Sequence, residues 1–100
     1  MDSAQLLALI DALRGRTVAV IGDVIADEFV YGRVARVSRE APVLILEYDS
    51  TEIVAGGAGN AANNVAALGG SASLVSIVGS DEPGERLVRS LHRGVDRRRL

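Results

Sequence analysis

The stretch AGGAGNAANNVAALGG, residues 55–70, contains all three asparagines of the chain and five of its eleven glycines. A glycine-rich turn that opens a helix exposes backbone N–H groups, so it can hold a phosphate, a dinucleotide or a sugar. Good helix formers follow the turn and Gly69-Gly70 would stop them, which predicts a helix over residues 60–68. Its predicted apolar side consists of Ala61, Val65 and Leu68. Which ligand the turn holds depends on what surrounds it.

Before this turn, the sequence predicts a helix and then a buried strand. Residues 2–14 have apolar side chains at helical spacing, with Asp2 or Ser3 as the N-cap. TVAVI, residues 17–21, is a short β-branched run without a polar face. This pattern is typical of a strand that is covered on both sides in a parallel sheet. The strand is predicted to end at Gly22-Asp23.

Residues 28–54 have a different pattern, which predicts an antiparallel hairpin. The extended runs VLILEY and TEIV are separated by Asp49-Ser50, which we expect to form the two-residue turn. Pro42 stands where a strand would begin rather than inside one. Such a ribbon between βαβ pieces is an inserted element that projects from the main sheet.

After the glycine-rich stretch, the sequence predicts a second parallel strand over residues 72–78. A third helix is expected from about Asp81 or Glu82, with Pro83 in its first turn. Its predicted buried side consists of Leu87, Val88 and Leu91. The chain ends in an arginine cluster at the place where a third strand would be expected.

We therefore expect residues 1–100 to be an incomplete single α/β domain. Residues 1–27 form a helix and the first strand, residues 28–54 the ribbon, and residues 55–95 the glycine loop, helix, strand and helix. Two strands with an unpaired edge leave apolar surface uncovered. The chain is accordingly expected to be marginally stable or to aggregate.

The composition excludes several kinds of site. All eleven basic residues are arginines, so the chain has no Schiff-base lysine and no G-x-x-x-x-G-K-[ST] phosphate loop. Cysteine is absent, which excludes disulfides and thiolate metal sites. The net charge of −2 and the scarcity of aromatic residues argue against nucleic acid as a partner. Without a signal peptide or a long apolar run, we expect a cytoplasmic protein with no membrane contact.

Two interpretations of the glycine loop compete with sugar binding. Gly57-x-Gly59-x-x-Ala62 resembles a dinucleotide-binding turn, and Asp81 lies about twenty residues further on, where a ribose-binding acid would be needed. In that fold, however, the turn follows the first buried strand, which here is TVAVI. Alternatively, the glycines only allow a sharp turn into a closely packed helix whose amides act as caps.

A sugar is favoured by the polar groups near the loop. Asp23 and Asp27 come just after the first strand, where ligands bind in open α/β sheets. A carboxylate accepts hydrogen bonds from neighbouring hydroxyls, and the amide of Asn60 can both donate and accept. Together with the backbone N–H groups of Gly56 and Gly57, these groups can bind a polyol. The alternative for Asp27 is a loop or cap acid.

The spacing of the loop resembles a known signature. Gly56-Gly57-Ala58-Gly59-Asn60-Ala61-Ala62 is followed after six residues by Gly69 and after nine more by Gly79. This pattern is similar, at every specified position, to the first signature of the ribokinase-like (PfkB) carbohydrate kinase family. The resemblance covers roughly residues 16–95 and implies the N-terminal part of a ribokinase-like three-layer α/β fold with an inserted β-ribbon lid. Within the family, GDVIADEFVYGRVARVSREAPV, residues 22–43, resembles the heptose-7-phosphate kinases.

The resemblance implies roles for particular residues. Asp27 would accept hydrogen bonds from sugar hydroxyls, the backbone of Gly56 and Gly57 would pack against the sugar, and Asn60 would bind another hydroxyl. Arg36 would hold a substrate phosphate bidentately, whereas the alternative for Arg36 and Arg39 is a solvated basic loop. The expected substrate-binding residues are Asp23, Asp27, Arg36, Gly56, Gly57 and Asn60.

The resemblance also implies an activity. The family uses ATP and Mg²⁺, and this subgroup would phosphorylate D-glycero-D-manno-heptose 7-phosphate at its anomeric hydroxyl, in ADP-heptose and lipopolysaccharide-precursor synthesis. Nothing in the chain matches the family's D-T-x-G-A-G-D segment, which carries the catalytic base, so we expect no catalytic residue, no metal ligand and no activity from these residues alone. The ribbon would serve as the lid and as a possible homodimer contact. The alternatives are another sugar or nucleoside kinase, a dinucleotide-binding module and a non-catalytic remnant.

Overall fold

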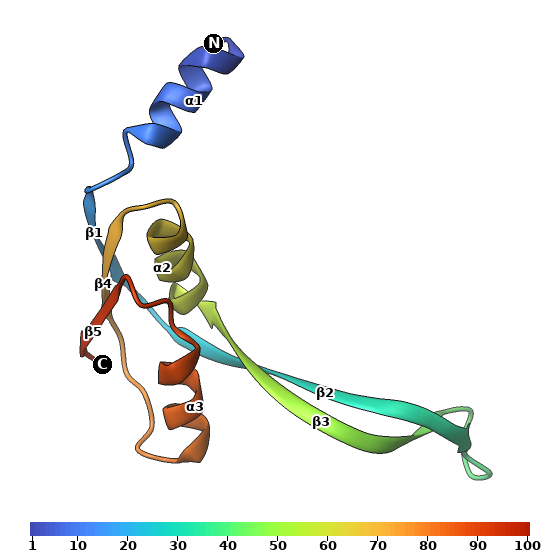
Figure 1. The fold of residues 1–100 in the computed structure, drawn as a ribbon. Helices are drawn as coiled ribbons and strands as arrows, with labels where there is room; N and C mark the ends of the chain where they lie inside the picture. The colour runs from blue at the N-terminus through green and yellow to red at the C-terminus, as the bar shows by residue number, and fades with distance from the viewer.

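A computed structural model describes residues 1–100 as three helices, a three-stranded sheet and a long two-stranded ribbon (Figure 1). The elements in chain order are α1 (Ser3–Asp11), β1 (Thr17–Ile21), β2 (Val24–Val37), β3 (Leu44–Gly57), α2 (Ala58–Ala67), β4 (Ser71–Val75), α3 (Glu82–Ser90) and β5 (Val95–Arg99). This mixed α/β architecture confirms the predicted fold class.

The main sheet has the strand order β1-β4-β5, with both neighbouring pairs parallel. The parallel pairing of the first two strands was predicted, but β4 ends at Val75, three residues before the predicted end. The predicted number of strands was wrong, because the arginine-rich segment VDRRR forms a third strand. Its side chains find polar partners: Arg97 donates to the carbonyl oxygens of Val88 at 2.9 Å and His92 at 3.1 Å.

Asp96 is the acidic partner within this third strand. Its carboxylate accepts hydrogen bonds from the Arg98 guanidinium at 2.7–3.1 Å, and Arg99 lies 3.6 Å away. These hydrogen bonds, with the two positive charges, hold the pKa of the Asp96 carboxyl well below its usual range. A strand of mostly charged residues can therefore occupy the sheet edge, where its side chains reach solvent and one another.

The first helix and the first strand are the least buried parts of the main body. α1 begins as predicted with Asp2 as the N-cap, in a capping box with Gln5, but it buries none of its residues and lies apart from the sheet (Figure 1). The prediction that β1 is covered on both faces was wrong, because Ile21 remains 77% exposed and only α2 packs against the strand. No second helix layer is present to cover its other face.

β2 and β3 pair along their whole length as an antiparallel ribbon that projects from the main body (Figure 1). The ribbon extends over residues 24–57, beyond the predicted 28–54, and its turn was predicted in the wrong place. Asp49-Ser50 lies inside β3, where Asp49 is the extra residue of a bulge between the pairs Tyr31↔Ser50 and Gly32↔Tyr48. The chain reverses instead between the two strands, where the backbone N–H of Ser38 donates to the Val43 carbonyl at 2.8 Å.

α2 begins two residues earlier than predicted and buries a different face. Its buried residues are Gly59, Ala62 and Ala66. The predicted apolar side was wrong, because Ala61 and Leu68 are exposed and Val65 is half-buried. Small residues occupy the buried face since the helix lies very close to the strands: a Cβ on Gly59 would be 2.7 Å from Val24 Cγ2 and 2.9 Å from the Ala55 Cβ. Close contact therefore selects small residues over large ones here.

The core lies between α2, α3 and the strands. It consists of Ile53, Ala55, Ala62, Ala66, Ala72, Leu74, Leu87, Leu91 and Val95. α3 begins at Glu82, within the predicted start, and its N-cap is Asp81, whose carboxylate accepts a hydrogen bond from Gly84 N at 3.0 Å. Leu87 and Leu91 are buried as predicted, while Val88 is half-buried. None of the three helices combines the length and apolar character needed to cross a membrane.

We predict that Leu74→Ala lowers the free energy of unfolding by about 2–5 kcal/mol, because Leu74 is completely buried and its removal leaves a cavity. Urea unfolding followed by circular dichroism measures the change. Ile77→Ala is the matched control, since Ile77 is 91% exposed and its loss should change stability by less than about 0.5 kcal/mol. Equal effects of the two substitutions would contradict this assignment of the core.

Candidate functional site

The end of β1, the base of the ribbon and the start of α2 meet at one junction. Three hydrogen bonds hold it: Gly22 N to Val75 O at 3.3 Å, Val24 N to the Ser76 hydroxyl at 3.1 Å, and Ala58 N to Asp23 O at 2.9 Å. The backbone of Asp23 is thus fixed between the sheet and the first turn of α2. Its side chain is exposed at this junction.

Asp27 and Gly56 approach each other directly at the base of the ribbon. Asp27 lies opposite Val54 in the ribbon, on the same ribbon face as Ile25 and Gly56. The Asp27 carboxylate lies over the Gly56 Cα, so that a Cβ on residue 56 would come within 2.9 Å of Asp27 Cγ and closer still to one carboxylate oxygen. Glycine at position 56 therefore determines where this carboxylate lies.

Gly57 ends the ribbon and begins α2 in one step. Its φ of +57° lies in the left-handed region, and a Cβ there would also collide with the carbonyl oxygen of Asp23. Because of this turn, the strand passes directly into the helix without a connecting loop. The first turn of α2 is thereby held against the residues that follow β1.

Asn60 lies in the first turn of α2 with an exposed side chain that makes no hydrogen bond. The idea that the amides cap the helix was wrong, since α2 has no side-chain cap. Asn63 has a structural role instead: its side-chain oxygen accepts a hydrogen bond from His92 N at 2.8 Å. The Asn60 amide is therefore free of protein partners, whereas the Asn63 amide oxygen is already engaged.

Arg36 lies far from this junction. It is nine positions along β2 from Asp27, which corresponds to roughly 30 Å at about 3.3 Å per residue. The structure thus brings Asp23, Asp27, Gly56, Gly57 and Asn60 to one region but leaves Arg36 at the tip of the ribbon.

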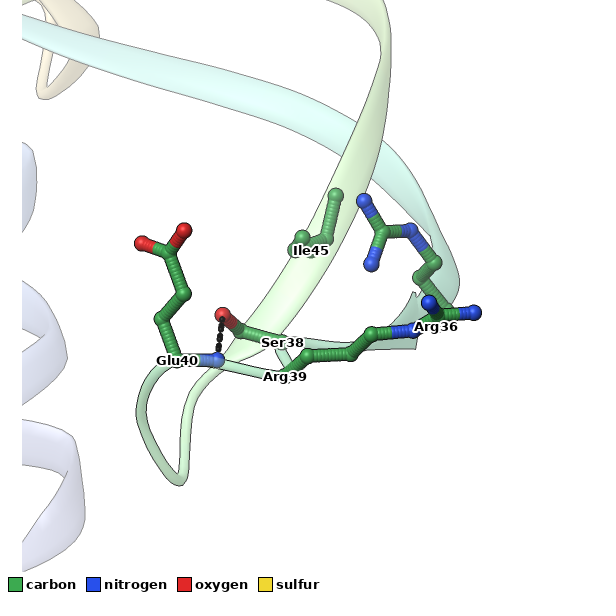
Figure 2. Close-up of a pocket in the computed structure, with 5 residues that line it drawn as sticks. All are labelled: Arg36, Ser38, Arg39, Glu40 and Ile45. Carbon is green, nitrogen blue, oxygen red and sulfur yellow. Dashed lines mark hydrogen bonds between the residues drawn. The ribbon is translucent and has the colours of Figure 1, made fainter.

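At the tip, Arg36 lines a polar hollow of about 520 Å³ (Figure 2). Its other lining residues are Ser38, Arg39, Glu40 and Ile45. Arg39 was a candidate from sequence, whereas Ser38 and Glu40 were not. The signal that could have located the hollow was Pro42, which marks this segment, rather than Asp49-Ser50, as the turn.

The junction has the chemistry of a polyol site. Two exposed carboxylates offer acceptors, and the free amide of Asn60 offers both a donor and an acceptor. The chain has no group of three or more His, Asp or Glu side chains placed to hold a metal. The region can therefore hold and orient a ligand through hydrogen bonds.

The dinucleotide interpretation is not supported by this geometry. The glycine turn follows β3 of the ribbon rather than a strand of the parallel sheet. Asp81, the proposed ribose-binding acid, uses its carboxylate to cap α3.

Comparison with known proteins gives consistent matches. Residues 16–100 match the pfkB family of carbohydrate kinases. The chain is 50% identical over 84 residues to the "Bifunctional protein HldE" of Bradyrhizobium diazoefficiens, which is 84% of this chain and 17% of the relative. It is 50% identical over 82 residues to the protein of the same name from Caulobacter sp. (strain K31), again 17% of the relative's length. The chain therefore spans about a sixth of the curated relatives that it matches.

We predict that Gly56→Ala displaces the Asp27 carboxylate and destabilises the chain by about 1–3 kcal/mol, because the added methyl group overlaps that carboxylate. The Asp27 side-chain carbon resonances in NMR spectra and urea unfolding measure the two effects. Gly22→Ala is the control, since its Cβ would meet only the Ala58 Cβ at an ordinary 3.5 Å. An unchanged Asp27 resonance in Gly56→Ala would refute the contact.

Proposed function

Since the chain belongs to the pfkB family of carbohydrate kinases, we propose that residues 1–100 form the sugar-binding part of an ATP-dependent kinase. The observation that carries this proposal is the junction at which the Asp27 carboxylate lies over Gly56, near the free amide of Asn60. Asp27 accepts hydrogen bonds from sugar hydroxyls, and Asn60 binds a further hydroxyl. Glycine at positions 56 and 57 is required for this arrangement, because the space of the missing side chains is filled by the Asp27 carboxylate and by the Asp23 carbonyl oxygen.

The substrate we propose is D-glycero-D-manno-heptose 7-phosphate. Residues 22–43 resemble the heptose-7-phosphate kinases, and the curated relatives from Bradyrhizobium and Caulobacter share one name. The reaction would transfer the γ-phosphoryl group of ATP to the anomeric hydroxyl, in a cytoplasmic pathway to ADP-heptose. The contribution of these residues is to orient the hydroxyl, which is a large part of phosphoryl-transfer catalysis.

ATP and Mg²⁺ do not fit the residues of this chain. There is no lysine for the phosphates and no acidic cluster for a cation. Gly57-Ala58-Gly59-Asn60 looks superficially like a G-A-G-D catalytic segment, but an asparagine side chain cannot take up the hydroxyl proton. We therefore assign the catalytic base and the nucleotide contacts to segments of the full enzyme other than these residues.

We further propose that the ribbon forms a contact with a second copy. Beyond Val30, one ribbon face carries the opposed pairs Val34↔Leu46 and Val37↔Leu44, with all four side chains 55–61% exposed. At the base of the ribbon, Ile53 continues this same face into the core. An apolar sheet face that is buried at one end and exposed at the other is a typical protein contact surface. The opposite face is mixed: it carries Asp27 and Arg36 together with apolar side chains such as Phe29.

Arg36 contributes to substrate binding in this scheme only if the outer ribbon bends towards its base. The bulge between Tyr31 and Gly32, with Asp49 unpaired, is a point where the ribbon can bend, because the ladder is interrupted there. Since Arg36 and Asp27 occupy the same face, bending towards that face would bring the guanidinium over the junction.

The sugar site predicts a specific response to ligand. Heptose 7-phosphate should shift the backbone amide resonances of Gly57 and Asn60 in NMR spectra, and Asp27→Asn should abolish the shift by removing a charged acceptor. Glu28→Gln is the matched control, because its side chain lies on the opposite ribbon face. With ATP added, the chain should transfer no phosphoryl group. A response to NAD in place of sugars would overturn the sugar site, whereas measurable turnover would contradict the assignment of the catalytic base to other segments of the enzyme.

The ribbon contact predicts a dimer. The combined substitution Val34→Glu and Leu46→Glu should convert a dimeric chain into a monomer in sedimentation velocity experiments, because it places charge on the apolar face. Arg33→Gln on the other face should leave the dimer unchanged. A monomeric unaltered chain at all accessible concentrations would count against this contact.

A further inference from the structure

Phe29 is the only phenylalanine of the chain, and it remains 50% exposed beside Asp27. The register of the ribbon pairs Asp27 with Val54 and Phe29 with Glu52. Because side chains alternate along a strand, residues 27 and 29 lie on one face of the ribbon, about 7 Å apart along β2. The aromatic ring and the carboxylate therefore border the same space at the base of the ribbon.

α2 and α3 pack against the face of the ribbon opposite Phe29. Ile53 and Ala55 lie on that opposite face and belong to the core. On the Phe29 face, the apolar side chains of Ile25, Phe29 and Val54 are 41–50% exposed. Sites for small molecules are lined mostly by apolar and aromatic side chains, with a few polar groups that fix the orientation of the ligand. The base of the ribbon has this composition.

A hydrogen bond farther out on the same face holds Glu52, the residue opposite Phe29. The Tyr31 hydroxyl donates to Glu52 Oε2 at 3.1 Å. This hydrogen bond, with the negative charge of Glu52, raises the pKa of the Tyr31 hydroxyl, which therefore keeps its proton and continues to donate. Since Tyr31 lies farther from the main body than Phe29, the bond draws the Glu52 carboxylate towards the tip. Phe29 thus stays open to a ligand.

A sugar ring has two kinds of surface, which match these two kinds of side chain. Its hydroxyl groups need hydrogen-bond partners such as the Asp27 carboxylate. Its C–H groups form apolar patches on the ring faces, and such a patch gains free energy when it leaves water. The slightly positive C–H groups are also attracted to the negative face of an aromatic ring. A carboxylate beside an aromatic ring therefore suits a cyclic polyol better than a linear one.

We propose that Phe29 forms the apolar wall of the sugar site, on which a pyranose ring stacks through its C–H groups while Asp27 binds its hydroxyls. The proposal rests on the proposed function for the class of ligand and adds a residue that determines specificity. Phe29 takes no part in the chemical step. It favours sugars that present several C–H groups on one ring face, and it disfavours epimers that place a hydroxyl against the aromatic ring, where that hydroxyl would lose its hydrogen bonds to water.

NMR spectra of the chain labelled with ¹³C-phenylalanine test the contact, because the label marks Phe29 alone. Titration with heptose 7-phosphate should shift the ring resonances saturably, and nuclear Overhauser effects should connect the ring to C–H protons on one face of the sugar. Phe29→Ala should weaken binding by about five- to tenfold, whereas Phe29→Tyr keeps the ring and should bind within about twofold of the unaltered chain. The amide shifts of Gly57 and Asn60 measure these affinities. Val30→Ala is the matched control, since Val30 is exposed on the opposite ribbon face.

The stacking would be refuted by ring resonances that do not respond to the sugar, or by equal affinities of Phe29→Ala and the unaltered chain. A stronger response of the ring to adenosine than to the heptose would assign the ring to a nucleobase instead. Asp27→Asn separates this proposal from the sugar site itself. If Asp27→Asn abolishes the amide shifts of Gly57 and Asn60 while Phe29→Ala leaves them unchanged, the stacking fails and the sugar site stands. If the ring responds but Asp27→Asn has no effect, the role of the carboxylate fails and the ring contact remains.

Discussion

The close approach between Asp27 and Gly56 is the contact on which the remaining structure depends. β3 ends at Gly57 and α2 begins at the next residue, and the Asp27 carboxylate lies directly against this segment at Gly56. At residues 56, 57 and 59 a Cβ would collide with a side chain or a carbonyl oxygen. Because these three residues lack side chains, ribbon, sheet and helix can meet closely, and the Asp27 carboxylate can lie directly against Gly56. The packing requirement and the proposed ligand site are two consequences of one local constraint.

The two faces of the ribbon carry different sets of residues away from the main body. Its register is shifted twice, by an extra residue in β3 and another in β2. The first interrupts the ladder at Gly32, and the second turns Arg36 towards the face that also carries Asp27. The apolar pairs remain together on the other face, continuous with the core at Ile53. A single hairpin can thus present one surface to a partner and the other to a charged ligand.

Much of this fold could be predicted from sequence, and the errors have physical causes. The strand 17–21, the helix that starts at Glu82 and the glycine turn follow from local patterns and were correct. The hairpin turn was misplaced because Asp49-Ser50 has turn composition but occupies a bulge, which only pairing with Tyr31 and Gly32 reveals. The third strand was missed because three consecutive arginines do not look like a strand until Val88, His92 and Asp96 supply their partners. The buried face of α2 was predicted wrongly because the short distance between the helix and the strands, rather than hydrophobicity, requires small residues such as Gly59 and Ala62.

The proposed sugar site was predictable as a set of residues but not as a geometry. Sequence spacing associated Asp27 with Gly56, but nothing in it showed that the two are in contact, or that Arg36 lies far from both.

The most direct test of the central claim joins residues 1–100 to the remaining segment of the Bradyrhizobium relative and measures ADP release with heptose 7-phosphate and ATP. The account predicts that the chimera is active, that Asp27→Asn removes most of its turnover and that Glu28→Gln does not. An Asp27→Asn chimera as active as the unsubstituted one would contradict the claim that this junction holds the sugar.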